Sequence, residues 1–257
     1  MLLRAIINSI ESVVPLSYQE NWDNSGMQVG DPGSDVRAVL LTTDVTESVV
    51  DEAIAKDCQL IISHHPLLFH GLRQVCGQSP QARCVERAIR HGIAIYSSHT
   101  AMDSYLHGVS GRIAERIGLT DYRILHESGE GYGLGVIGDL PQPITKDELF
   151  RRVKDGMQAP WIRYCCGQKD TVQRIAVCGG AGAEFIEDAI AQGADAYLTA
   201  DCKYHEFQAA DRRILLLDID HWTSEHFTRD LFCELLEPLG IRCLISEADM
   251  SPIKLEI

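Results

Sequence analysis

The stretch VLLTTDVTESVVDEAIAKDCQLIISHH, from Val39 to His65, has a counterpart in IAVCGGAGAEFIEDAIAQGADAYLTAD, from Ile175 to Asp201, after a shift of 136 residues without a gap. Few residues are identical, but each copy has an apolar strand, a turn of small residues, a helix and a second apolar strand. Short apolar runs bounded by turn residues are typical of buried strands. The repeat therefore predicts a βαβ unit in each half of the chain. The apolar positions that coincide in the two helices are Val49, Val50, Ala53 and Ile54 in the first copy and Phe185, Ile186, Ala189 and Ile190 in the second.

The similarity extends beyond the βαβ units. Each half has one more predicted strand, Ile93–Tyr96 in the first and Ile214–Leu217 in the second. Each of these strands leads into a histidine that is followed four residues later by a carboxylate: His99 with Asp103, and His221 with Glu225. Strands that alternate with helices of about 10 to 12 residues favour mainly parallel sheets with right-handed crossovers. We therefore predict an α/β protein made of two pseudo-symmetric, interlinked halves.

The two predicted halves are joined by a shorter region. We place the first half at residues 1–123, the second half at residues 169–257 and a connecting segment at residues 124–168. At the N-terminus, Met1 to Val14 has an amphipathic pattern that is ended by Pro15. That pattern predicts a helix rather than a signal peptide.

Composition excludes several classes of protein. The chain has 257 residues, 45% of them hydrophobic, and a formal net charge of −14. This acidity argues against tight binding to long nucleic acid, which needs a basic surface. No apolar run approaches the roughly 20 residues of a membrane span. The nine cysteines include no Cys-x-x-Cys pair, so we expect reduced thiols in a cytoplasmic protein and no zinc ribbon.

The candidate ligands lie at predicted strand ends. In CQLIISHHPLLFH, from Cys58 to His70, an apolar strand runs into His64 and His65 just before Pro66. Ligands of parallel α/β sheets gather beyond the carboxyl ends of the strands. Two adjacent histidines at such a position suit two metal ions, one each, although an ordinary pair of loop histidines gives the same pattern. The residues that share this placement are His64, His65, His99, Asp103, His221 and Glu225.

Other residues have less specific patterns. His99 fits a metal ligand, a hydrogen-bond partner of a ligand or a proton shuttle equally well. Lys203 and His205 follow the predicted strand Ala196–Thr199, where they suit phosphate binding or proton transfer, or simply a polar loop. The glycines in the turn after Ile175 lack the spacing of a phosphate-binding loop. Tight packing of a helix on a strand explains Gly179, Gly180 and Gly182.

Several motifs in order resemble the NGG-interacting-factor-three-like proteins, which are often labelled GTP cyclohydrolase I type 2 homologues. The similarity runs almost from end to end. The motifs are WDNSGMQVG, IISHHPLLFHGL, YSSHTAMDSYLHGVSGRIAERIGL, IAVCGGAGAEFI, DAYLTADCKYHEF and DHWTSEHF. The resemblance implies a dinuclear metal centre with Asp103 or Glu225 as the bridging ligand, and a toroidal homohexamer with its metal sites facing an inner cavity. The ligands that it implies are His64, His65, Asp103, His221 and Glu225.

This chain departs from the family pattern in two respects. The large domain that some members carry between the halves is absent, because residues 124–168 alone connect them. Where family members often have Asp-Ala-Ala, this sequence has Asp103-Ser104-Tyr105. The ligand position is kept, but the bulkier Tyr105 would narrow the site.

We therefore expect a metal-dependent hydrolase that acts on a small nucleotide-like or phosphate-containing substrate, or on a short oligonucleotide. In this reading His99, His205 or Lys203 acts as a general acid or base or binds phosphate. The alternative is a non-catalytic metal-binding ring, a regulatory module that docks a protein partner. These ligand types accept Zn, Mn, Fe, Co or Ni, so the sequence leaves the identity of the metal open.

Overall fold

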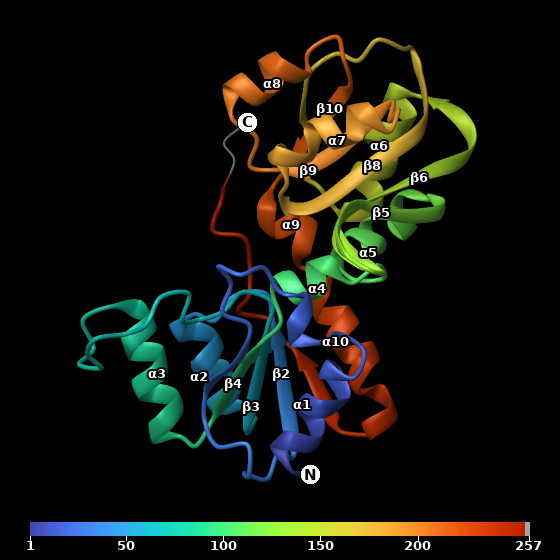
Figure 1. Cartoon of the computed structure of the whole chain (residues 1–257). Helices are drawn as coiled ribbons and strands as arrows, with labels where there is room; N and C mark the ends of the chain where they lie inside the picture. The colour runs from blue at the N-terminus through green and yellow to red at the C-terminus, as the bar shows by residue number, and fades with distance from the viewer. Residues whose placement is uncertain (255–257) are drawn as a thin grey trace. The chain divides into compact units, whose positions relative to one another are not determined.

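Eleven strands form two separate sheets in the computed structural model, which describes residues 1–254 of the chain (Figure 1). Each sheet belongs to its own compact unit. The first unit contains Met1–Met102 and His226–Met250, and the second contains Asp103–Glu225 with the described residues from Ser251 onward.

The sheet of the first unit has the strand order β1-β4-β3-β2-β11. Its strands β11, β2, β3 and β4 are parallel, and β1 is antiparallel to β4. The elements of this unit are α1 (Leu3–Glu11), η1 (Leu16–Tyr18), β1 (Gly26–Val29), β2 (Ala38–Thr42), α2 (Glu47–Ala55), β3 (Leu60–Ser63), α3 (Pro80–Arg90), β4 (Ala94–Ser97), α10 (Thr228–Leu236), η3 (Glu237–Leu239) and β11 (Arg242–Ile245). The short helix α4 (Thr100–Ser104) begins in this unit and ends in the second.

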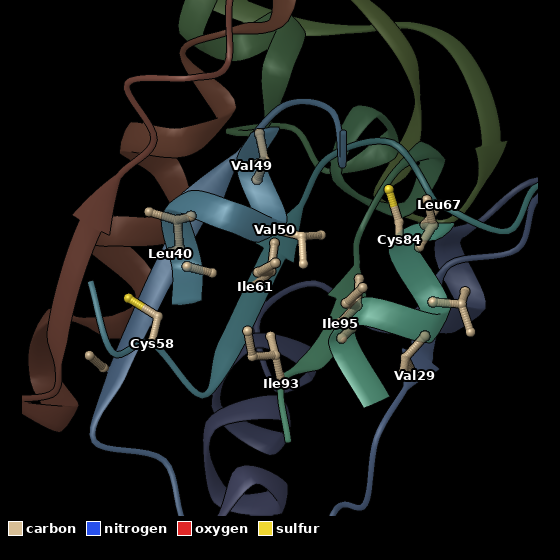
Figure 2. Close-up of a cluster of buried hydrophobic side chains, with 14 residues drawn as sticks. Val29, Leu40, Val49, Val50, Cys58, Ile61, Leu67, Cys84, Ile93 and Ile95 are labelled. Carbon is tan, nitrogen blue, oxygen red and sulfur yellow. The ribbon is translucent and has the colours of Figure 1, made fainter. Parts of the chain in front are cut away.

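Helices α2 and α3 pack on one face of this sheet, where their apolar side chains meet those of the strands (Figure 2). Leu40, Ile61 and Ile95 come from β2, β3 and β4, and Val50 comes from α2. The Thr46 hydroxyl caps the start of α2 by accepting a hydrogen bond from the Val49 amide at 3.3 Å. Such caps satisfy amide groups that the first helical turn leaves unpaired.

The second unit has a mixed sheet with the strand order β5-β6-β8-β9-β10-β7. Strands β8, β9 and β10 are parallel, while β5, β6 and β7 pair antiparallel with their neighbours. The elements are α5 (Val109–Ile117), β5 (Thr120–Gly129), β6 (Tyr132–Thr145), α6 (Lys146–Met157), β7 (Arg163–Tyr164), β8 (Thr171–Ala181), η2 (Ala183–Phe185), α7 (Ile186–Ala191), β9 (Ala196–Ala200), α8 (Tyr204–Ala210), β10 (Leu215–Ile219) and α9 (His221–Glu225).

The predicted duplication is visible as a parallel triplet of strands in each unit. In the first unit, Ile61 of β3 pairs with Leu40 of β2 on one side and with Ile95 of β4 on the other. In the second unit, Tyr197 pairs with Ala176 on one side and Leu216 on the other. The α/β fold with two related halves is therefore confirmed. The expectation of mainly parallel sheets holds for the first sheet but is wrong for the second, because β5, β6 and β7 add antiparallel pairings to its parallel strands. The carboxyl ends of β3, β4, β9 and β10 carry the candidate site residues.

The compact units divide the chain differently from the predicted halves. Residues 124–168 are mostly strand and helix that belong to the second unit, where β6 pairs with β8. Residues 226–250 belong to the first unit, because β11 pairs in parallel with β2. The division also places Asp103 in the second unit rather than with His64 and His65.

Other sequence expectations have clear counterparts. The N-terminal helix is α1, which buries Leu3, Ile6 and Ile10. All nine cysteines are free thiols, and those at positions 76 and 166 are exposed. No helix among the described residues is both long and apolar enough to span a bilayer.

Candidate functional site

Three histidines of the first unit lie together at the carboxyl end of its sheet. The ring centroids of His64 and His65 are 4.8 Å apart, and those rings lie 5.3 and 5.2 Å from the ring of His99. One ring nitrogen from each residue lies within 4.8 Å of those of the other two. This spacing allows the imidazoles to share one or two cations.

Neighbouring parallel strands bring these residues together. β3 and β4 pair in register up to Ser63 and Ser97, so the residues that follow emerge at the same edge of the sheet. The amides of His64 and His65 still donate to the carbonyls of Thr42 and Thr43, at 3.2 and 2.9 Å. The histidine pair is therefore held by the sheet rather than by a loose loop.

In each of these three rings, Nδ1 lies against an oxygen of the protein. His65 Nδ1 is 2.9 Å from Asp44 Oδ1, and His99 Nδ1 is 2.9 Å from Asp23 Oδ1. His64 Nδ1 is 3.2 Å from the Ser98 carbonyl oxygen. Metal-binding histidines usually donate their second N–H to a carboxylate or a carbonyl, which fixes the ring and its tautomer. Nε2 is then the nitrogen that would coordinate a metal.

The carboxylate of Asp23, which lies beside the His99 ring, accepts several hydrogen bonds. Its side chain is fully buried. Besides the imidazole of His99, it accepts hydrogen bonds from the Ser25 hydroxyl at 2.8 Å and the Thr100 hydroxyl at 2.7 Å. Burial acts to raise the pKa of Asp23, but the hydrogen bonds from His99 and Thr100, the charge of His99 and the bond from Ser25 outweigh it. The pKa is held well below its usual range.

The second unit has a cluster of its own around α9. His221 Nε2 lies 3.0 Å from Glu225 Oε2, as expected for residues four apart on a helix. An Asp103 carboxylate oxygen lies within 4.8 Å of one from Glu225. His221 Nδ1 lies 2.8 Å from Asp201 Oδ2, which repeats the pattern of the first unit. Three of the predicted ligands are thus gathered within this unit.

Gly180 shapes the surroundings of Glu225. It is in the left-handed region with φ of +64°, and its amide donates to the Ser224 hydroxyl at 2.9 Å. A Cβ atom at this position would lie 2.2 Å from Glu225 Oε1. From the sequence alone, Gly180 is explained by the packing of a helix on a strand. The structure gives it a second role, because only glycine leaves room for the Glu225 carboxylate in this position.

Lys203 and His205 lie elsewhere in the second unit, at the start of α8, and both are exposed. His205 Nδ1 contacts Gln208 Oε1 at 3.3 Å. Within residues 1–254, neither side chain belongs to a group that could hold a metal. Their roles in proton transfer or phosphate binding stay predictions.

Sequence reasoning missed the three aspartates that orient the rings, Asp23, Asp44 and Asp201. A partial signal existed for each. Asp23 lies in the WDNSGMQVG motif, and Asp44 and Asp201 lie in turns of the aligned repeat. None of these positions by itself indicated which histidine it would contact.

The fold and the two clusters define an α/β protein whose histidines and carboxylates are of the kind that bind divalent metals. Imidazoles already oriented by oxygen acceptors fit such an ion well. The chain belongs to the Duf34/NIF3 (NGG1p interacting factor 3) family, whose model matches residues 1–252.

Comparison with individual relatives agrees with this assignment. A Clostridium acetobutylicum protein named "GTP cyclohydrolase 1 type 2 homolog" is 30% identical, over 98% of both chains. The "Protein NIF3 homolog" of Schizosaccharomyces pombe is 28% identical, over 95% of this chain and 94% of its own. The crystal structure of a Staphylococcus aureus protein matches with a TM-score of 0.90 and 26% identity, over 100% of this chain and 99% of the other.

Proposed function

We propose that His64, His65, Asp103, His221 and Glu225 together hold two divalent metal ions, and that the protein is a metal-dependent hydrolase of small nucleotide-like or phosphate-containing substrates. The observation that carries this proposal is the pairing of imidazole Nδ1 with a carboxylate at two of these ligands, His65 and His221. The relatives named GTP cyclohydrolase 1 type 2 homolog are compatible with a substrate of this class.

Charge supports a centre shared by the two clusters. The first-unit cluster offers imidazoles, which are neutral when they bind a metal, and the second-unit cluster adds the carboxylates of Asp103 and Glu225. Two divalent cations held by imidazoles alone would leave four positive charges without a balancing ligand. Asp103 and Glu225 would supply the negative charge that two such cations need. Neither cluster has both enough ligands and enough negative charge for two ions.

Metal ions bound there would supply the Lewis acidity that promotes attack of water on a phosphoryl group or a ring carbon. The protein would supply the proton transfer. His99 is suited to it, because ionised Asp23 contacts its Nδ1 at 2.9 Å and so fixes the orientation of the ring. The aspartate stays charged at all physiological pH values, so this support does not vary with pH.

Elemental analysis of protein purified without chelator or metal-affinity resin tests the site first. We expect two divalent ions per chain in the native protein. His64→Ala and Glu225→Gln should each reduce the affinity for both ions while leaving the circular dichroism spectrum unchanged. Exposed residues of the same types provide the controls His91→Ala and Glu127→Gln, which should bind metal normally. If each variant lost only the metal of its own cluster, the ions would not share a centre.

Hydrolysis is tested on metal-loaded protein with a panel of nucleotides and short oligonucleotides. Turnover that disappears in Glu225→Gln supports the enzyme. Full metal occupancy with no turnover on the panel would contradict a hydrolase and favour the regulatory module. The homohexameric ring and the cytoplasmic location expected from the sequence are part of the same proposal, and the native mass in solution tests the ring.

A further inference from the structure

A cavity of about 490 Å³ opens within the second unit, beside one of the proposed metal ligands. This volume lies in the range of small-molecule sites, roughly 300 to 1,000 Å³. Its lining comes from strand ends and from segments that precede β7 and follow β11. The lining residues are Trp161, Ile162, Arg163, Asp201, Ile219, Asp220, His221 and Ile253.

The apolar part of the lining includes one large aromatic ring. Trp161 is half-buried, and the Arg163 guanidinium carbon lies 5.7 Å from its ring centroid. That guanidinium is held in place, because Arg163 Nε donates to the buried Asp218 at 2.6 Å and Nη2 donates to the Cys202 carbonyl at 3.0 Å. An indole beside a fixed cation loses little freedom when a flat ligand packs on it.

The polar part of the lining is dominated by acceptors. Asp220 is nearly fully buried and already accepts from Thr223 and from the Ser251 hydroxyl. Asp201 is half-exposed, and only its Oδ2 is engaged, by His221. Within residues 1–254, Asp201 Oδ1 accepts no hydrogen bond, so it can accept one from a ligand.

The charges also limit what can bind. Among the described residues of the lining, Arg163 is the one arginine or lysine, and its charge is neutralised by Asp218, which lies outside the lining. Asp201 and Asp220 add negative charge to the lining. An anionic group is therefore disfavoured inside the cavity. A neutral ring that donates an N–H is favoured, and any phosphate on the same ligand belongs on the side of His221 and Glu225, where cations would bind.

We propose that this cavity binds the base of a nucleotide: a planar heteroaromatic ring that packs on Trp161 and donates an edge N–H to Asp201. The proposal deepens the proposed function, on which it rests for the role of the neighbouring metal ligands. It names the part of the substrate that the second unit recognises. His221 is shared by both sites, since it lines the cavity and contacts Glu225.

Nucleoside binding to chelator-treated protein tests the cavity separately from the metals. Guanosine and adenosine carry N–H donors on the ring edge, whereas purine riboside has the same ring system without a donor on its six-membered ring. By isothermal titration calorimetry, we expect at least one of the first two to bind about tenfold more tightly than purine riboside. Trp161→Leu should weaken the binding of that nucleoside at least tenfold, and Trp161→Phe should largely restore it.

Asp201→Asn should abolish the preference over purine riboside. Asparagine tolerates the left-handed backbone of residue 201, where φ is 57°, so the variant should fold. Two residues of the same unit outside the cavity provide matched controls. Tyr204→Leu removes an exposed aromatic ring, and Asp211→Asn removes a carboxylate that is 50% exposed, against 53% for Asp201. Both controls should bind like the native protein.

The outcomes separate this inference from the proposed function. Suppose that nucleoside binding depends on Trp161 but the metal-loaded protein shows no turnover. That result would contradict the proposed hydrolase activity and support the proposed base-binding cavity. Turnover with an unchanged KM in Trp161→Leu would overturn the proposal that the cavity binds the base, while the proposed hydrolase activity would still hold. If none of the three nucleosides binds at 1 mM, the proposal of a base-binding cavity is also overturned.

Discussion

Replacing Gly180 with alanine should remove metal from the protein without unfolding it. The added Cβ would lie 2.2 Å from Glu225 Oε1, whereas ordinary contacts of this kind begin near 3.4 Å. The carboxylate must therefore move by about 1 Å, while metal–ligand distances tolerate only about 0.2 Å. Changes to residues that merely orient a ligand already cost about 10- to 100-fold in metal affinity. Displacing a ligand itself should cost at least about 100-fold.

Gly193→Ala provides the matched control. Gly193 belongs to the same unit and has a similar left-handed backbone, with φ of +76°, but no atom lies within 4 Å of the position of its added Cβ. Both variants should lose about 1–2 kcal/mol of stability, because alanine is strained in this conformation. Gly180→Ala should lose somewhat more, because the buried carboxylate of Glu225 must also move. Only Gly180→Ala should lose metal.

The assay combines chelator competition for metal affinity with thermal unfolding of the metal-free proteins. Two folded variants with a selective loss of metal in Gly180→Ala would support the assigned role. Native metal affinity in Gly180→Ala would contradict the role assigned to Gly180, because it would mean that Glu225 either moves freely or binds no metal.

Two further predictions concern the first unit. The pKa of Glu52 is lowered to about 2. Burial acts to raise this pKa, but hydrogen bonds from the Glu247 amide, Lys56, Ser246 and the Ala248 amide outweigh the effect of burial. Against an ordinary value of 4.5, this stabilises the fold by up to about 3 kcal/mol above pH 4.5, and the contribution is lost as the pH falls towards 2. Urea unfolding should therefore show Glu52→Gln less stable than native protein at pH 7, with a gap that closes towards pH 2; a pH-independent gap would contradict this. Asp44→Ala removes the acceptor of His65 and should lower metal affinity about 10- to 100-fold while sparing the fold. An unchanged affinity in chelator competition would argue against a role for Asp44 in orienting the ring.

Local sequence patterns determined much of the fold. Buried parallel strands have near-continuous apolar runs, so Leu60–Ile62 and Ala196–Thr199 could be recognised as strands from the sequence. Because parallel strands end at one edge of a sheet, the positions after them indicated a site. The grouping of His64 with His99 follows from this rule alone.

The distant residues that contact those ligands are set by the packing of the whole chain. Asp23 reaches His99 from a loop 76 residues earlier in the chain, and a cavity forms where Trp161 and Ile253 join residues at the ends of β9 and β10. Residues 242–245 form strand β11 of the first sheet, because the free edge of β2 pairs with them in parallel. Periodicity and spacing record how a residue relates to its near neighbours along the chain. The partner of a side chain such as His99 depends instead on how whole elements pack, and no local pattern encodes that.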